Sequence, residues 1–119
     1  MDAPVMPSNG REKHPLLLAE APVLPNVDYA AGPTLVVFDL GGPCERCVAH
    51  RGVLREAGFD PVIIAPETPD YERIASEWGC LNLHGTFIVD KAGVVRWGHS
   101  FDHPWENIAA LNQIMARYV

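Results

Sequence analysis

Cys44 and Cys47 stand three positions apart, after an apolar run at residues 35–38 and a glycine- and proline-containing turn at residues 41–43. Such a run is short enough for a strand buried on both faces, and the turn predicts that the cysteines open a helix. Two cysteines at this spacing can form a disulfide across one helical turn. The unpaired N–H groups and partial positive charge of a helix N-terminus favour the thiolate, which is the reactive form. The motif therefore predicts a redox-active dithiol.

Two other interpretations of the cysteine pair stay open. A closed zinc site needs four ligands, and because the sequence has no second C-x-x-C motif, His50 and Cys80 would have to complete it. The cysteines could instead be inert, since cysteine outside disulfides is often a small buried hydrophobe. The dithiol remains the leading interpretation, and we expect neither a metal nor a cofactor.

The composition narrows the class of protein. A chain of 119 residues fits one domain, and its formal net charge of −6 argues against a nucleic-acid partner, which would be met by a basic patch. No apolar stretch approaches the ~20 residues of a membrane span, and the basic start and apolar run of a secretory signal are missing. Three cysteines, an odd number, do not make a secreted disulfide framework. We therefore expect a cytoplasmic protein without membrane association.

Prolines divide the chain unevenly. Six of the eleven lie in the first 33 residues and exclude a long helix or central strand there. We expect residues 1–33 to form a proline-rich, partly flexible N-terminal extension and residues 34–119 to form the domain. Hydrophobic periodicity and Gly/Pro boundaries predict the order β-α-β-α-β-β-α for the domain, with Thr68 capping the second helix and Pro69 at its first position. The predicted strands cover residues 35–38, 61–65, 86–89 and 94–97, and the predicted helices cover residues 44–57, residues 69–78 and a last segment that opens at Pro104.

Two stretches carry a resemblance to a known family, at residues 36–47 (VVFDLGGPCERC) and 85–97 (GTFIVDKAGVVRW). Here the chain resembles the thioredoxin superfamily over about residues 34–119. The local sequence of the two stretches is similar to the peroxiredoxin-like branch, which comprises alkyl hydroperoxide reductase, thiol-specific antioxidant and redoxin proteins. The resemblance implies a thioredoxin-like α/β fold, with a central mixed four-stranded sheet flanked by helices on both faces. It also implies thiol redox chemistry at the helix start.

The sequence departs from the family's patterns near the cysteines. Pro43 stands where the thioredoxin branch usually has Trp, and Gly85, preceded by His84, stands where that branch has a cis-proline. Typical peroxiredoxins carry Pro-x-x-x-Thr-x-x-Cys around the peroxide-reducing cysteine. Aligned on Cys47, this sequence has Cys44 at the Thr position and Leu40 at the Pro position. The usual peroxidase pocket is therefore absent.

Strand directions predict which other residues surround the sulfurs. If the first two strands are parallel and the third runs in the opposite direction, the ends of the first, second and fourth strands and the start of the third lie at the same edge of the sheet. The loops at this edge form a rim around Cys44. A histidine there could accept the thiol proton or stabilise the thiolate; the alternative is a solvated loop residue or a helix cap. The residues expected at this rim are Pro43, Glu45, Arg46, His84, Gly85, Thr86 and His99, with Asp102 and His103 as further candidates.

Three more polar or sulfur-bearing residues need an interpretation. Asp39 sits inside a strand that otherwise looks buried, so its carboxylate must find partners there. It is either a proton acceptor for the dithiol or an exposed strand end. His50 lies one turn beyond Cys47 on the same helical face, and we expect it to be partly buried structure. We expect Cys80 to be packed rather than redox-active.

The leading functional hypothesis is a thiol–disulfide oxidoreductase in which Cys44 attacks a substrate disulfide and Cys47 resolves the mixed disulfide. Its expected partners are a disulfide-bearing protein or a small-molecule thiol or peroxide, and an external reductant such as a thioredoxin or glutathione system. A homodimer is compatible with the sequence. One alternative is an antioxidant thiol peroxidase with Cys47 peroxide-reactive and Cys44 resolving. Another is a non-catalytic interaction module that docks a partner through residues 1–33.

Overall fold

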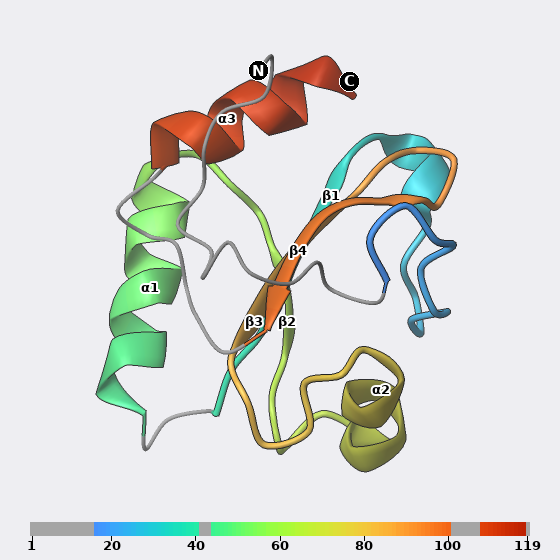
Figure 1. The fold of residues 1–119 in the computed structure, drawn as a ribbon. Helices are drawn as coiled ribbons and strands as arrows, with labels where there is room; N and C mark the ends of the chain where they lie inside the picture. The colour runs from blue at the N-terminus through green and yellow to red at the C-terminus, as the bar shows by residue number, and fades with distance from the viewer. Residues whose placement is uncertain (1–15, 41–43, 101–107, 119) are drawn as a thin grey trace.

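The computed structural model describes residues 16–40, 44–100 and 108–118. Within these segments it is an α/β protein with a four-stranded mixed sheet, three α-helices and one 3-10 turn, and it confirms the predicted element order (Figure 1). None of the helices in these segments has both the length and the apolar character needed to cross a membrane. The elements are η1 (Tyr29–Ala31), β1 (Thr34–Phe38), α1 (Glu45–Glu56), β2 (Val62–Ile64), α2 (Tyr71–Glu77), β3 (Gly85–Val89), β4 (Val95–Ser100) and α3 (Ile108–Arg117).

The strand order in the sheet is β2-β1-β3-β4. Strands β1 and β2 are parallel, whereas β3 is antiparallel to both β1 and β4. The register pairs Phe38, the last residue of β1, with Gly85, the first residue of β3. The end of β1 therefore lies beside the start of β3, and the predicted strand directions are confirmed.

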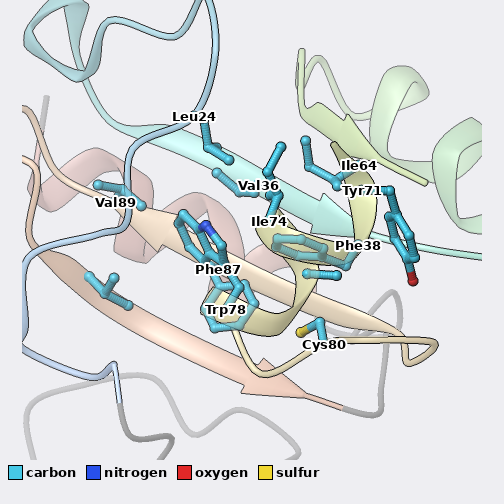
Figure 2. Close-up of a cluster of buried hydrophobic side chains, with 12 residues drawn as sticks. Leu24, Val36, Phe38, Ile64, Tyr71, Ile74, Trp78, Cys80, Phe87 and Val89 are labelled. Atoms are coloured by element: carbon cyan, nitrogen blue, oxygen red, sulfur yellow. The ribbon is translucent and has the colours of Figure 1, made fainter. Parts of the chain in front are cut away.

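Side chains alternate along β1, so its residues pack against different elements on the two faces of the sheet. Val36 and Phe38 point into a cluster under α2 and the N-terminal segment, where Trp78 lies 5.5 Å from Phe38 and 5.0 Å from Phe87 between ring centroids (Figure 2). Leu35 and Val37 point the other way, into a cluster with α1 and α3. In Figure 1 these two helices lie on one side of the sheet and α2 on the other. The central strand is therefore buried on both faces, as its apolar sequence predicts.

The N-terminal segment from residue 16 onward packs against this core. It runs antiparallel to the start of β4, where the N–H of Leu18 donates to the carbonyl of Val95 (2.8 Å) and the N–H of Val95 donates to the carbonyl of Ala19 (2.9 Å). Further along, the side chain of Leu24 is buried in the α2-side cluster. Residues 16–24 thus contribute to the same core as the domain, although the division at residue 33 separates them in the sequence prediction.

The predicted start of α2 is wrong. The helix begins at Tyr71, and its N-cap is Asp70 in the left-handed region, with φ of 66°. The hydroxyl of Thr68 instead accepts a hydrogen bond from the N–H of Ala65 (2.9 Å). Thr68 therefore stabilises the turn after β2, a local bond that competes with helix capping. The expected opening of the last helix at Pro104 lies outside the described residues.

The β3–β4 hairpin is held by Asp90, a buried carboxylate. It accepts hydrogen bonds from the N–H groups of Ala92 and Val94 (both 2.9 Å) and from Nε of Arg96 (2.7 Å). Burial alone would raise the pKa of Asp90, but these three donors hold that pKa below its ordinary value. Cζ of Arg96 also lies 5.2 Å from the ring centroid of Tyr118, so the hairpin contacts the residue that directly follows α3.

A substitution at Gly98 tests the close packing of β4 against Phe87. A Cβ at this position would lie 2.5 Å from Cδ2 of Phe87, whose ring is fully buried against Trp78. We expect Gly98→Ala to lower the free energy of unfolding by about 1–3 kcal/mol, the usual cost of overpacking a core. Gly52→Ala is the matched control: nothing lies within 4 Å of its added Cβ, and alanine should stabilise α1 by up to about 1 kcal/mol. Urea unfolding measures both, and equal effects would contradict the packing described.

Asp90 also predicts a pH dependence. Because its pKa is lower in the folded chain, the unfolded chain takes up the proton first as the pH falls. The stability that the carboxylate contributes is present above its unfolded pKa of about 4 and is lost as the pH falls through the folded pKa. Unfolding of the wild type and of Asp90→Asn at several pH values should show a smaller acid loss for the variant. Parallel curves for the two proteins would refute this role.

Candidate functional site

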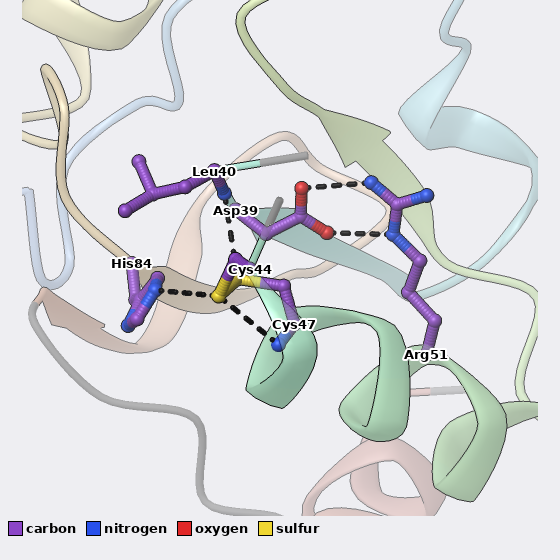
Figure 3. The surroundings of a disulfide bond; sticks show 6 residues. All are labelled: Asp39, Leu40, Cys44, Cys47, Arg51 and His84. Carbon is purple, nitrogen blue, oxygen red and sulfur yellow. Dashed lines mark hydrogen bonds and ion pairs between the residues drawn. A yellow bond between two sulfur atoms is a disulfide. The ribbon is translucent and has the colours of Figure 1, made fainter. Parts of the chain in front are cut away.

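Cys44 and Cys47 form a disulfide at the N-terminus of α1, with their Cα atoms 5.2 Å apart (Figure 3). Cys44 is the N-cap residue, and Cys47 lies in the first turn of the helix. The two differ in burial, because Cys44 is partly exposed whereas Cys47 has no exposed surface. Of the two residues, only Cys44 presents surface to a second molecule, and its sulfur is the outer sulfur of the pair.

Backbone N–H groups face both sulfurs. The N–H of Cys47 donates to Sγ of Cys44 (3.2 Å), which makes Cys44 a sulfur analogue of a capping residue. The N–H of Leu40 donates to Sγ of Cys47 (3.4 Å). Donors in these positions stabilise a thiolate on either sulfur once the disulfide is reduced, as does the partial positive charge of the helix N-terminus.

His84 lies beside the outer sulfur. It directly precedes β3, and because Gly85 pairs with Phe38, it is held just beyond the end of β1. Its Nε2 is 3.4 Å from Sγ of Cys44, and the side chain is partly exposed. This confirms the predicted proximity of His84 to Cys44.

Asp39 and Arg51 form a bidentate ion pair next to Cys47. The Asp39 side chain has no exposed surface, and its two oxygens accept hydrogen bonds from Nε (2.7 Å) and Nη2 (2.8 Å) of Arg51 (Figure 3). The hydrogen bond with Asp39 is the main reason why the pKa of Arg51 is raised. The expectation that Asp39 forms an exposed strand end is therefore wrong. Arg51 was not predicted, although its position four residues after Cys47 places it on the same helical face.

The other predicted rim residues divide into three groups. Glu45 and Arg46 are exposed in the first turn of α1. Gly85 and Thr86 are buried in β3, and the backbone of Thr86 pairs with Val37 and His99. Pro43, Asp102, His103 and the side chain of His99 lie outside the described residues.

His50 and Cys80 are both fully buried, and neither belongs to the group of ligating atoms at the sulfur pair. His50 is fully buried on α1, more deeply than expected. Cys80 is packed in the α2-side cluster, which confirms its expected packing. Among the described residues, the group with metal-ligating atoms close together is Cys44, Cys47 and His84, all within 4.8 Å of one another. The zinc set weighed from the sequence, with His50 and Cys80, does not form.

No protein-family model matches this chain, and no curated protein matches its sequence. Its function must therefore be inferred from the chemistry and geometry of the residues around the disulfide.

The Asp39–Arg51 pair yields a stability prediction. Arg51→Met leaves a buried carboxylate without its cation, and we expect this variant to lose about 3 kcal/mol of unfolding free energy. Arg73→Met is the matched control, because Arg73 pairs with Asp70 and Glu77 on the surface and such pairs contribute at most about 1 kcal/mol. Adding Asp39→Leu to Arg51→Met should recover part of the loss. Equal destabilisation by the two arginine variants in urea unfolding would show that the Asp39–Arg51 pair has no special role.

Proposed function

We propose that the chain is a thioredoxin-like thiol–disulfide oxidoreductase that cycles Cys44 and Cys47 between dithiol and disulfide. The observation that carries the proposal is the disulfide itself, placed where β1 leads into α1, with one partly exposed and one buried cysteine. The sheet order β2-β1-β3-β4, with its antiparallel β3, supports the thioredoxin-like assignment. The resemblance at residues 36–47 and 85–97 supports it independently.

The unequal burial of the two cysteines supports different roles for their sulfurs. In the reduced protein, the Cys44 thiolate attacks one sulfur of a substrate disulfide, which forms a mixed disulfide and releases the other substrate sulfur as a thiolate. The Cys47 thiolate then attacks Sγ of Cys44, forms the internal bridge and releases the second substrate thiolate. Two electrons pass to the substrate, whose two sulfurs take up the two protons given up by the cysteines.

His84 is positioned to move one of these protons. Its Nε2 lies 3.4 Å from Sγ of Cys44, so a neutral imidazole can accept the thiol proton before attack. The resulting imidazolium stabilises the Cys44 thiolate by charge and can return the proton to the departing substrate sulfur. Asp39, with both oxygens bound by Arg51, acts instead as an anchor for the helix.

An external thiol reductant, such as a thioredoxin or glutathione system, restores the starting state, and the same exchange in reverse would oxidise a partner's thiols. The substrate is a disulfide-bearing protein or a small disulfide, and the proposed setting is the cytoplasm. A peroxidase with Cys47 as the peroxide-reactive residue is less favoured, because Cys47 has no exposed surface. A passive interaction module does not account for the position of His84.

Cysteine variants test the proposal. With a small aromatic disulfide as substrate and dithiothreitol as reductant, Cys44→Ser should abolish turnover. Cys47→Ser, reduced and then freed of dithiothreitol before the substrate is added, should stop after the first step and accumulate a mixed disulfide on Cys44, detected as the mass of one substrate half. Cys80→Ala is the matched control, since this thiol is packed in the core outside the pair, and it should keep wild-type turnover.

Three outcomes would contradict this assignment. If Cys44→Ser turns over like the wild type, Cys44 is not the nucleophile. If Cys47→Ser accumulates its adduct elsewhere, the order of attack is wrong. If the wild type consumes hydrogen peroxide with the same reductant but leaves the disulfide substrate unchanged, the peroxidase alternative replaces the oxidoreductase.

A further inference from the structure

The Cys44–Cys47 pair and His84 together present three metal-binding donors at one point. Two are sulfur and one is an imidazole nitrogen, and the three atoms lie within 4.8 Å of one another. They come from two elements far apart in the sequence, the start of α1 and the residue before β3. We propose that the reduced site binds one zinc ion through Sγ of Cys44, Sγ of Cys47 and Nε2 of His84, an inference that rests on the proposed cycling of the cysteines.

The distances fit a tetrahedral ion. With Zn–S of about 2.3 Å and Zn–N of about 2.0 Å, neighbouring sulfur and nitrogen ligands lie about 3.5 Å apart, and two sulfur ligands about 3.8 Å apart. Nε2 of His84 is already 3.4 Å from Sγ of Cys44. Reduction removes the bond between the sulfurs, and rotation of side chains whose Cα atoms are 5.2 Å apart can then open their separation to the required value. The backbone can therefore stay as it is.

The chemistry of the donors selects the ion. Thiolates and imidazole are the ligands of zinc, whereas magnesium and calcium prefer oxygen. Two thiolates and a neutral imidazole carry two negative charges, which a divalent cation cancels. Each sulfur also accepts a backbone N–H, from Cys47 for Cys44 and from Leu40 for Cys47. Such outer-shell donors orient metal ligands and are part of how a protein holds its metal.

Zinc and the disulfide exclude each other, because both use the same two sulfurs. A bound ion would therefore protect the dithiol from oxidation until a disulfide substrate displaces it. That step is balanced when the zinc dithiolate, one substrate disulfide and two protons give the internal disulfide, a free zinc ion and two substrate thiols. Three donors from the described residues also leave the fourth position of the ion for water or a substrate thiolate.

A zinc titration tests the proposal. Reduced full-length protein, freed of reductant under anaerobic conditions, is titrated with Zn²⁺ in competition with a chromogenic chelator, and the same titration is run on the oxidised protein. We expect one zinc per reduced chain and none per oxidised chain. Cobalt(II) in place of zinc should give the intense near-ultraviolet absorption of thiolate-to-metal charge transfer, which reports sulfur ligation without any activity assay.

Variants separate this site from adventitious binding. Cys44→Ser should abolish tight binding. His84→Gln should weaken it at least about 10-fold, the lower end of what the loss of even an outer-shell partner costs a metal site. Cys80→Ala should bind like the wild type. Zinc affinity unchanged in His84→Gln, or equal in the oxidised and reduced proteins, would overturn the assignment.

The outcomes also distinguish this inference from the oxidoreductase proposal. If the protein reduces a disulfide substrate through Cys44 but the reduced form binds no zinc, the metal site is wrong and the oxidoreductase stands. If the disulfide cannot be reduced by excess dithiothreitol, both are wrong.

Discussion

The bidentate contact between Asp39 and Arg51 fixes the end of β1 against the second turn of α1. A buried carboxylate is costly unless it is paired, so this contact restricts how the helix can lie on the sheet. Cys47 is one helical turn before Arg51 and therefore takes its position from the same contact. The position of the sulfur pair in the fold therefore depends on an ion pair that takes no part in electron transfer.

The sheet register supplies the other half of the site. Strand β1 is buried on both faces, and its antiparallel pairing with β3 places Gly85 opposite Phe38. The residue before Gly85 must then lie beyond the end of β1, where α1 begins. This juxtaposition brings an imidazole to the outer sulfur, while each of the two sulfurs also accepts a backbone N–H. The difference between the two sulfurs, on which the proposed reaction depends, thus follows from strand pairing and helix position.

Most of the secondary structure and the position of the cysteine pair could be predicted because local sequence patterns specify them. The β-branched run ending at Phe38, the cysteine pair after a turn and the polar turn after Val89 each specify an element through their own residues. Strand directions then placed His84 near Cys44. The partner of Asp39 could not be predicted from the sequence, since several charged residues share α1 and only the packing of the helix on the sheet selects Arg51. The sequence could not predict whether Thr68 caps α2 or closes the turn after β2, because both use the same hydroxyl.

The central claim is that Cys44 and Cys47 interconvert between dithiol and disulfide in the folded protein. Its most direct test equilibrates the protein with redox buffers of graded potential and assigns the paired cysteines by mass spectrometry at each step. We predict one reversible two-electron transition, with Cys44 joined to Cys47 in the oxidised form and Cys80 a thiol throughout. Thiols that stay unpaired across the whole range, or a bridge that includes Cys80, would contradict the account.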